Sequence, residues 1–162
     1  MPKLYVLVGV PGSGKTTWVG NQSFDWKRTA YISTDKLVEI HAQSIGLSYS
    51  DVFKDYMPEA VKLMVEDAQQ AFEENLDIVW DQTSTTVASR ARKLRMTPDH
   101  YTKIAVVFQT PSADTHAQWL DRPGKEIPTE VIEDMISNFE EPMVHEGFDG
   151  IVYVQNQNLV TK

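Results

Sequence analysis

The sequence of 162 residues contains no cysteine, which excludes disulfide bonds and metal sites built from thiolates. An absence of cysteine agrees with a reducing compartment, and we expect a cytoplasmic protein. Histidine is also sparse, and its four copies do not have the spacing of zinc ligands. They are His41, His100, His116 and His145. A zinc centre is therefore not expected.

Long apolar runs are absent as well. The first ten residues, MPKLYVLVGV, contain a short apolar run, far below the roughly 20 apolar residues of a membrane span. We therefore expect a buried strand at this position and no membrane association. The sequence does not indicate an oligomeric state.

Basic residues are outnumbered by acidic ones, 15 to 23, which gives a net charge of −8. This balance argues against broad, charge-driven adhesion to a polyanion. One segment differs, because five of the basic residues fall between positions 90 and 103. They are Arg90, Arg92, Lys93, Arg95 and Lys103. Such clusters are usually solvated helix faces, although this one could also hold a nucleic-acid strand.

The apolar residues that are present include five continuous runs bounded by turn residues. The runs span residues 4–8, 30–32, 78–80, 104–108 and 151–154. Continuous rather than alternating runs predict strands that are buried on both faces of a sheet. With 41% hydrophobic residues the chain can bury one compact core, so we expect a single domain over residues 1–162.

Helical patterns separate the expected strands. A short helix is expected at Lys15–Asn21, and Pro58 can serve as the first residue of an amphipathic helix. Another amphipathic helix opens at Pro128 and stops before Pro142. This alternation predicts an α/β fold, with a parallel sheet between two layers of helices. Ligands of such sheets bind beyond the carboxyl ends of the strands.

Residues 9–16, GVPGSGKT, match the phosphate-binding pattern G-x-x-x-x-G-K-[ST] and lie between an expected strand and an expected helix. The glycines let backbone N–H groups converge on phosphate oxygens, and the dipole of the following helix adds to that field. Lys15 would bridge the β- and γ-phosphates of ATP, and the Thr16 hydroxyl would ligate Mg²⁺. The expected nucleotide-binding residues are Gly12, Ser13, Gly14, Lys15, Thr16 and Thr17. A chance glycine-rich turn is the alternative.

Two acidic residues follow two of the expected strands. Asp35 comes after the run that ends at Ile32, and Asp81 comes after the run that ends at Trp80. A kinase needs one carboxylate to accept the proton of the attacking hydroxyl and another on the magnesium side. If the third strand neighbours the first, Asp81 fits the magnesium side through a water molecule, and Asp35 is the base. The alternatives are a helix cap at Asp35 and a strand-terminating turn at Asp81.

A short lid is expected at approximately residues 119–128, where Pro123 and Gly124 favour a turn. Arg122 in this segment can swing over the triphosphate and stabilise the charge that develops in the transition state. A plain surface arginine is the alternative.

With these motifs in this order, the chain resembles the 5′-kinase domain of phage polynucleotide kinases and related phage DNA kinases. The matching stretches are residues 9–18, Thr34-Asp35, Asp81 with Thr83, and Arg122 followed by Pro128. The resemblance implies a three-layer P-loop kinase fold whose parallel sheet holds the five expected strands. It also implies that Lys15, Asp35 and Arg122 are catalytic.

On the acceptor side, the resemblance implies that Asp81 and Thr83 shape the substrate site, and we add Arg90 from the basic segment as a substrate-binding residue. The chain departs from the family pattern at two positions. Three residues after the catalytic aspartate the polynucleotide kinases place an arginine that grips the acceptor phosphate, and here that residue is Val38. Four residues before the lid arginine they carry a second arginine, and here that residue is Gln118.

The leading interpretation is a kinase that uses ATP and Mg²⁺ to phosphorylate a hydroxyl of DNA or RNA, most simply the 5′-hydroxyl. One alternative is a kinase of the hydroxymethyl group of a modified pyrimidine, 5-hydroxymethyluracil, in phage DNA. Another is a small-molecule kinase that acts on a nucleoside, nucleotide or sugar, which the acidic net charge favours. From a different class, a nucleotide-dependent switch or hydrolase has less support, because the sequence shows no second acidic Walker-type glutamate.

Overall fold

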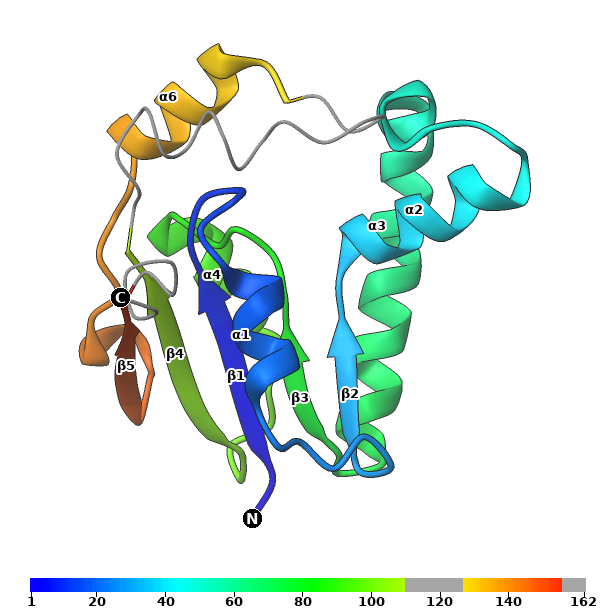
Figure 1. Cartoon of the computed structure of the whole chain (residues 1–162). Helices are drawn as coiled ribbons and strands as arrows, with labels where there is room; N and C mark the ends of the chain where they lie inside the picture. Colours follow the sequence, from blue (N-terminus) through cyan, green and yellow to red (C-terminus); the bar gives the residue numbers. More distant parts are fainter. Residues whose placement is uncertain (110–126, 156–162) are drawn as a thin grey trace.

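A five-stranded parallel sheet forms the centre of the computed structural model, which describes residues 1–109 and 127–155. The strand order across the sheet is β2-β3-β1-β4-β5 (Figure 1). The strands are β1 (Lys3–Val8), β2 (Thr29–Ile32), β3 (Asp77–Trp80), β4 (Thr102–Phe108) and β5 (Gly150–Val154). All five strands expected from the apolar runs are confirmed, each starting one or two residues earlier than its run.

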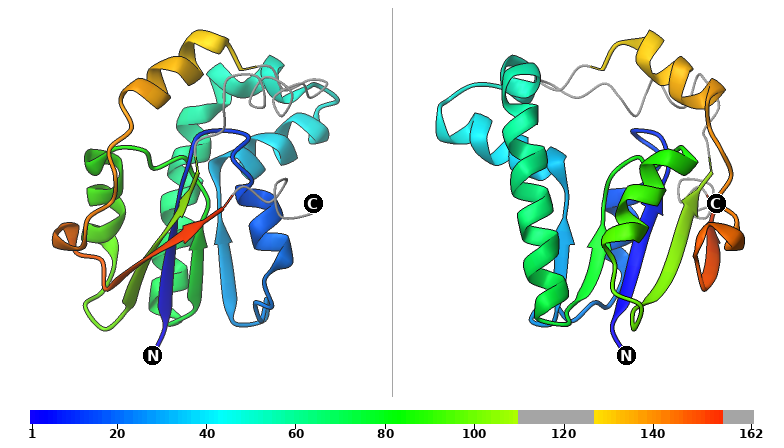
Figure 2. Two further views of the ribbon diagram at one scale, coloured as in Figure 1. Left: turned by 60° about the vertical axis from the view of Figure 1, so that its left-hand side comes forward. Right: turned by 180° about the vertical axis from the view of Figure 1, so that it is seen from behind.

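Helices cover both faces of this sheet, which confirms the three-layer α/β architecture. The helices are α1 (Lys15–Asn21), α2 (Thr34–Ser44), α3 (Tyr49–Glu73), α4 (Val87–Met96) and α6 (Thr129–Ser137), with a 3-10 turn η1 (Val144–Glu146). Figures 1 and 2 show α1 on one face of the sheet and α3 with α4 on the other. The carboxyl ends of β1, β3 and β2 lie at the same end of the sheet, where α2 and the loop after β1 also lie (Figure 1).

The central strand β1 is buried on both sides, because its side chains alternate between the two helical layers. Leu4, Val6 and Val8 belong to the apolar cluster that includes Met64 of α3, and all three are fully buried. Leu7 packs in the opposite cluster with α1. Each such side chain contributes about 1.5–3 kcal/mol through burial. Burial on both faces explains why the strand sequences are continuously apolar rather than alternating.

The start of α3 differs from the sequence prediction. The helix begins at Tyr49 rather than Pro58, because Ser48 and Asp51 form a capping box. The Ser48 Oγ accepts from the Asp51 amide at 3.3 Å, and the Asp51 Oδ2 accepts from the Ser48 amide at 3.0 Å. These bonds satisfy N–H groups that the helix start leaves without partners. Pro58 therefore lies inside α3, where it cannot donate a backbone hydrogen bond.

The other expected helices agree more closely with the structure. The helix α1 spans Lys15–Asn21 as expected, and α6 begins at Thr129, directly after Pro128. None of the helices in the described ranges is long and apolar enough to cross a membrane.

Candidate active site

The loop that joins β1 to α1 has a shape that requires glycine at three positions. Gly12 and Gly14 have φ angles of 80° and 98°, which side-chain-bearing residues rarely adopt. Gly9 needs the absence of a side chain for another reason. A Cβ atom at Gly9 would lie 2.5 Å from the Ser13 Oγ and 2.9 Å from the Phe108 Cβ. The sequence motif is therefore matched by a tightly turned loop at the carboxyl end of the central strand.

The polar groups of this loop fit a polyphosphate. The Lys15 ammonium lies back over the loop and donates to the carbonyl oxygens of Gly9 at 2.9 Å and Val10 at 3.0 Å. The Ser13 hydroxyl is buried and has no hydrogen-bond partner, which is costly for a polar group. Thr16 and Thr17 are exposed in the first turn of α1, where helix N–H groups and the helix dipole favour an anion. An ammonium and an unsatisfied buried hydroxyl in a glycine-shaped loop are what a triphosphate needs.

A second loop, which follows β3, is attached directly to the phosphate loop. The Gly9 amide donates to the Thr83 carbonyl at 2.9 Å. The Gln82 side chain donates to the Thr34 hydroxyl at 3.2 Å and so reaches the start of α2. The loop after β3 therefore connects the phosphate loop to the helix that carries Asp35.

Asp81 stands at the end of β3, and β3 is hydrogen-bonded to β1 as the magnesium-side assignment requires. Asp81 is 8% exposed, and its amide donates to the Ile32 carbonyl at 2.7 Å. The Tyr31 hydroxyl donates to the Asp81 Oδ2. Burial first, and then the Asp81 charge, raises the pKa of Tyr31 above its ordinary value, so this phenol stays a donor. The backbone of Asp81 is thus held by β2 and its carboxylate by Tyr31, next to the phosphate-loop strand.

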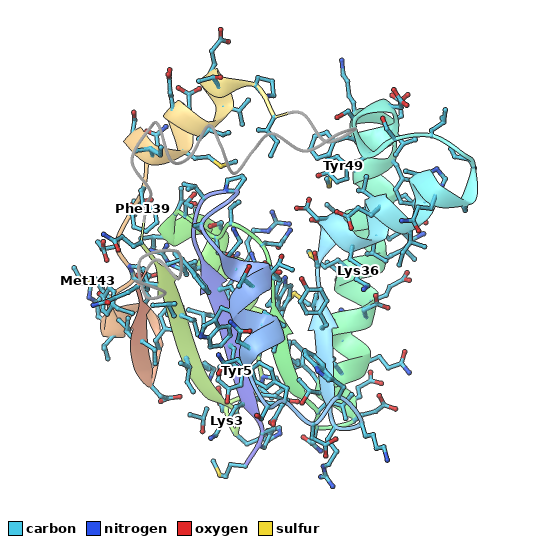
Figure 3. All side chains as sticks on the ribbon, in the orientation of Figure 1. Lys3, Tyr5, Lys36, Tyr49, Phe139 and Met143 are labelled. Carbon is cyan, nitrogen blue, oxygen red and sulfur yellow. The ribbon has the colours of Figure 1, made fainter. Side chains whose placement is uncertain are left out.

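Asp35 lies in the first turn of α2, beyond the end of β2. The helix cap is Ser33, whose Oγ accepts from the Lys36 amide at 3.3 Å, so the alternative that Asp35 itself is the cap is wrong. The Tyr49 hydroxyl donates to the Asp35 Oδ1 at 2.6 Å. Figure 3 shows Tyr49 at the upper end of α3 and Lys36 on α2, at the same end of the molecule as the phosphate loop. Because the strands are parallel, both acidic residues lie at this end.

Arg90 does not have the role that the sequence predicted. Its side chain is fully buried, and the guanidinium forms two bonds with the Glu146 carboxylate, at 2.9 and 3.1 Å. A third bond, of 2.9 Å, goes to the Ser84 carbonyl. A guanidinium that is buried and paired in this way cannot contact a substrate. The prediction of a substrate-binding role for Arg90 is therefore replaced by a structural role, in which it joins α4 to η1.

Lys93 also turns inward, although the basic segment was expected to be a solvated face. Its side chain is 7% exposed, and its Nζ lies 5.5 Å from the centre of the Trp80 ring. Burial lowers the pKa of Lys93 to about 8, and the nearby charges of Arg92 and Arg90 act in the same direction. Two of the five cations of the segment 90–103 are therefore inside the protein.

A protein-family model described as an AAA domain matches residues 4–142. The chain belongs to this AAA-domain family. The match confirms a P-loop, kinase-like nucleotide-binding domain. The finer resemblance to phage polynucleotide kinases stays a prediction.

Solved structures with the same fold as this AAA-domain protein include three kinase-related examples. A proposed kinase from Chloroflexus aurantiacus j-10-fl has a TM-score of 0.67 at 18% identity, covering 95% of this chain and 88% of that one. A chain of the Pnkp1/Rnl/Hen1 RNA repair complex has a TM-score of 0.64 at 20% identity, and the match covers 85% of this chain and 43% of that one. A gluconokinase from Sinorhizobium meliloti 1021 has a TM-score of 0.55 at 19% identity, and the match covers 96% of this chain and 83% of that one. This protein thus spans less than half of the RNA repair chain.

A magnesium ion in this AAA-domain site would depend on few protein ligands. Within residues 1–109 and 127–155, no three His, Cys, Asp or Glu side chains gather as a metal site. Mg²⁺ commonly keeps several water ligands and is held by one or two protein groups together with substrate phosphates. The exposed Thr16 hydroxyl at the start of α1 and the Asp81 carboxylate at the end of β3 are the kinds of ligand that such a sparse site uses.

The lid prediction falls mostly outside the described residues. Arg122 and residues 119–126 belong to the segment 110–126, and the structure describes the expected lid at positions 127 and 128 alone, before α6. The catalytic role of Arg122 therefore stays a prediction for this AAA-domain protein.

The two tyrosines that donate to the acidic residues were not expected from the sequence. Tyr31 and Asp81 are 50 positions apart, and Tyr49 and Asp35 are 14 apart. Tyr31 stands in the strand directly before the Asp35 segment, and Tyr49 stands directly after the cap residue Ser48. Their positions beside these two features are the sequence signal that could have pointed to them. Which acidic residue each tyrosine bonds depends on how β2 lies beside β3 and how α3 packs on α2.

Proposed function

We propose that this protein is a kinase that uses ATP and Mg²⁺ to phosphorylate a hydroxyl of nucleic acid, most simply the 5′-hydroxyl of DNA or RNA. The observation that carries the proposal is the position of Asp35 and Asp81 beyond two neighbouring strands, at the end where the phosphate loop turns. A nucleotide switch needs the loop, whereas a phosphotransferase also needs a base beside the terminal phosphate.

Each group has a role in the proposed transfer. The amides of residues 12–17 and the Lys15 ammonium bind the phosphates. Thr16 would hold Mg²⁺, which would supply positive charge to offset that of the phosphates. The acceptor oxygen forms a bond to the γ-phosphorus while the bond from that phosphorus to the β,γ-bridging oxygen breaks. Asp35 accepts the proton that the acceptor hydroxyl loses. Asp81 would help to hold Mg²⁺ through a water molecule, and Arg122 stabilises the charge on the transferred group.

The nucleic-acid acceptor has support from the family resemblance and from one structural relative. The Pnkp1/Rnl/Hen1 structure is that of an RNA repair complex, and its matching chain shares the fold of this protein. At 20% identity this likeness supports the fold of a kinase and leaves the acceptor to experiment.

A small-molecule acceptor is the second candidate, and a specific observation favours it. Val38 occupies the position at which the polynucleotide kinases carry a phosphate-gripping arginine, and it is fully buried between α2 and α3. Arg90 and Lys93 are buried as well. The described part of the site thus offers few cations for an acceptor phosphate, as a neutral acceptor would allow. The gluconokinase has a similar fold, and its name gives a small molecule, gluconate, as its acceptor.

Transfer of the labelled γ-phosphate of ATP tests the proposal. The acceptors are 5′-hydroxyl oligonucleotides of DNA and RNA, DNA that contains 5-hydroxymethyluracil, nucleosides and gluconate. We expect the oligonucleotides to be labelled, with the Lys15→Ala variant as the inactive control. Labelling of gluconate or nucleosides alone would replace the proposal with the second candidate, and labelling of none would refute the proposal of a nucleic-acid acceptor.

Salt dependence separates the two acceptor classes further. A site that contacts several phosphates of an oligonucleotide releases counterions, so its affinity falls steeply as salt rises. The affinity for a neutral small acceptor should change little as salt rises. A measured affinity for oligonucleotide that is insensitive to salt would therefore contradict recognition of a nucleic-acid backbone.

A further inference from the structure

The Tyr49 hydroxyl donates a hydrogen bond of 2.6 Å to the Asp35 Oδ1, and this bond joins the starts of two helices. Tyr49 is the first residue of α3, directly after the cap residue Ser48, which forms a capping box with Asp51. The helices α2 and α3 pack through buried apolar side chains, which are Val38 and Ala42 of α2 and Val52 and Ala60 of α3. The tyrosine is thus delivered to Asp35 by a fixed helix start and a packed helix pair.

Such a bond restricts the direction of a carboxylate. Hydrogen bonds to ionised groups are short and roughly twice as strong as neutral ones. With Oδ1 held by the phenol, rotation of the Asp35 side chain is limited, and the direction of Oδ2 is set. A general base contributes when its lone pair points at the proton it removes, so this direction matters for transfer.

We propose that Tyr49 is a positioning residue that holds the Asp35 carboxylate in the orientation in which it accepts the proton of the acceptor hydroxyl. The proposal rests on the proposed function, in which Asp35 is the base. Tyr49 acts through Asp35 and takes no proton itself.

The surroundings of Tyr49 keep it protonated, as this role requires. Burial first, then the hydrogen bond and charge of Asp35, and then the charge of Glu39 raise the pKa of Tyr49 above its ordinary value. Both acidic groups stand on α2 and face the phenol from the element packed against it. The hydroxyl therefore stays a donor at neutral and moderately alkaline pH.

Asp35 and Asp81 differ in how much the fold restricts their side chains. Asp81 is buried at the end of β3, where the sheet limits its movement, and Tyr31 donates to it. Asp35 is instead exposed, and its partner Tyr49 is half-buried. Exposed side chains change rotamer within picoseconds to nanoseconds. A phenol that is anchored on a neighbouring helix restricts that motion.

The test compares wild type with Tyr49→Phe, which keeps the ring and removes the hydroxyl. With the acceptor that wild type labels best, we expect kcat to fall about tenfold, part of the roughly 100- to 10,000-fold effect of a general base. The KM for ATP stays unchanged, because the phosphate loop is untouched. The matched control is Tyr56→Phe, two turns further along α3, where the ring stacks on His41 at 3.8 Å. This control keeps wild-type kcat.

A double-mutant cycle shows whether the hydroxyl acts through Asp35. In an Asp35→Asn background, Tyr49→Phe should have no further effect on the residual kcat. An equal fall in both backgrounds, or no fall in either, would overturn the positioning role. Urea unfolding of each variant separates these results from loss of folded protein.

A titration tests the pair independently of any acceptor. The ring ¹³C resonance of Tyr49, assigned through Tyr49→Phe, is followed with pH in wild type and in Asp35→Asn. Loss of the Asp35 charge should lower the pKa of Tyr49, and an unchanged titration would overturn the pairing. If no acceptor is phosphorylated by wild type, the proposed function fails while this titration still reports on the hydrogen bond.

Discussion

Lys15 is the residue on which nucleotide binding depends most directly. Its ammonium bonds the Gly9 and Val10 carbonyl oxygens and would exchange them for phosphate oxygens when ATP binds. We expect Lys15→Ala to lower kcat by about 100- to 1,000-fold, as loss of a preorganised charge does. The measurement is γ-phosphate transfer, with circular dichroism to show an intact fold. Wild-type transfer by this variant would contradict the assignment of the loop.

Gly9 supports the same loop because it has no side chain, which lets Ser13 and Phe108 approach its backbone closely. A Cβ atom there would overlap the Ser13 Oγ at 2.5 Å and the Phe108 Cβ at 2.9 Å. We expect Gly9→Ala to lower the free energy of unfolding by about 1–3 kcal/mol and to weaken ATP binding, because the loop must shift. Urea unfolding measures the free energy of unfolding, and calorimetry measures ATP binding. The control is Gly20→Ala in α1, where a Cβ meets no atom within 4 Å and should stabilise the helix slightly.

Lys93 gives the folded protein a characteristic pH dependence. Burial lowers its pKa to about 8 from 10.5, so between these pH values the unfolded chain binds more protons than the folded one. The free energy of unfolding contributed by this group therefore rises with pH across that window, by about 3 kcal/mol. Lys93→Met should raise stability near neutral pH and flatten this rise in urea unfolding. Arg95→Met, at an exposed position of the same helix, should leave the slope unchanged.

At the residue scale, the sequence predicts the backbone part of the site better than its side-chain partners. The phosphate loop and the acidic residues after β2 and β3 follow from local pattern, because a motif and a strand end are local features. The donors Tyr31 and Tyr49 and the burial of Arg90 do not. Arg90 pairs with Glu146, 56 positions away, and no local pattern distinguishes that pairing from a solvated cation.

At the scale of elements, the strands are the most predictable part of the fold. Burial on both faces leaves a continuous apolar run, and each run became a strand of the sheet. The start of α3 was harder to predict, because Pro58 resembles a first helical residue while the capping box of Ser48 and Asp51 lies ten and seven positions before it. Two satisfied amides at the cap and the packing of Val52 extend the helix through the proline.

This placement of Pro58 predicts a stabilising substitution. Proline in a helix interior costs about 3 kcal/mol relative to alanine, and roughly 1 kcal/mol of this is returned because proline restricts the unfolded chain. We expect Pro58→Ala to raise the free energy of unfolding by about 2 kcal/mol, measured by urea unfolding. Pro98→Ala, outside the helices at the turn before β4, serves as the control and should not stabilise. Destabilisation by Pro58→Ala would indicate that α3 does not continue through this residue in solution.

At the scale of the whole molecule, contacts between distant segments assemble the site. The bond between Gly9 and Thr83 joins the loops after β1 and β3, and the pair of Arg90 and Glu146 joins α4 to η1. Breaking such a buried pair is costly, because it leaves an uncompensated charge inside the protein. The sheet, the acidic residues and the phosphate loop therefore depend on segments from both halves of the chain.

The strand order also governs when the site can exist during synthesis. In the order β2-β3-β1, the first two strands to leave the ribosome are separated by the third, which begins at Asp77. A nascent chain halted before Asp77 already carries the glycines and the lysine of its loop, yet β1 still has neither β3 nor β4 beside it. ATP could therefore protect the emerging polypeptide from proteolysis only after translation has passed this strand.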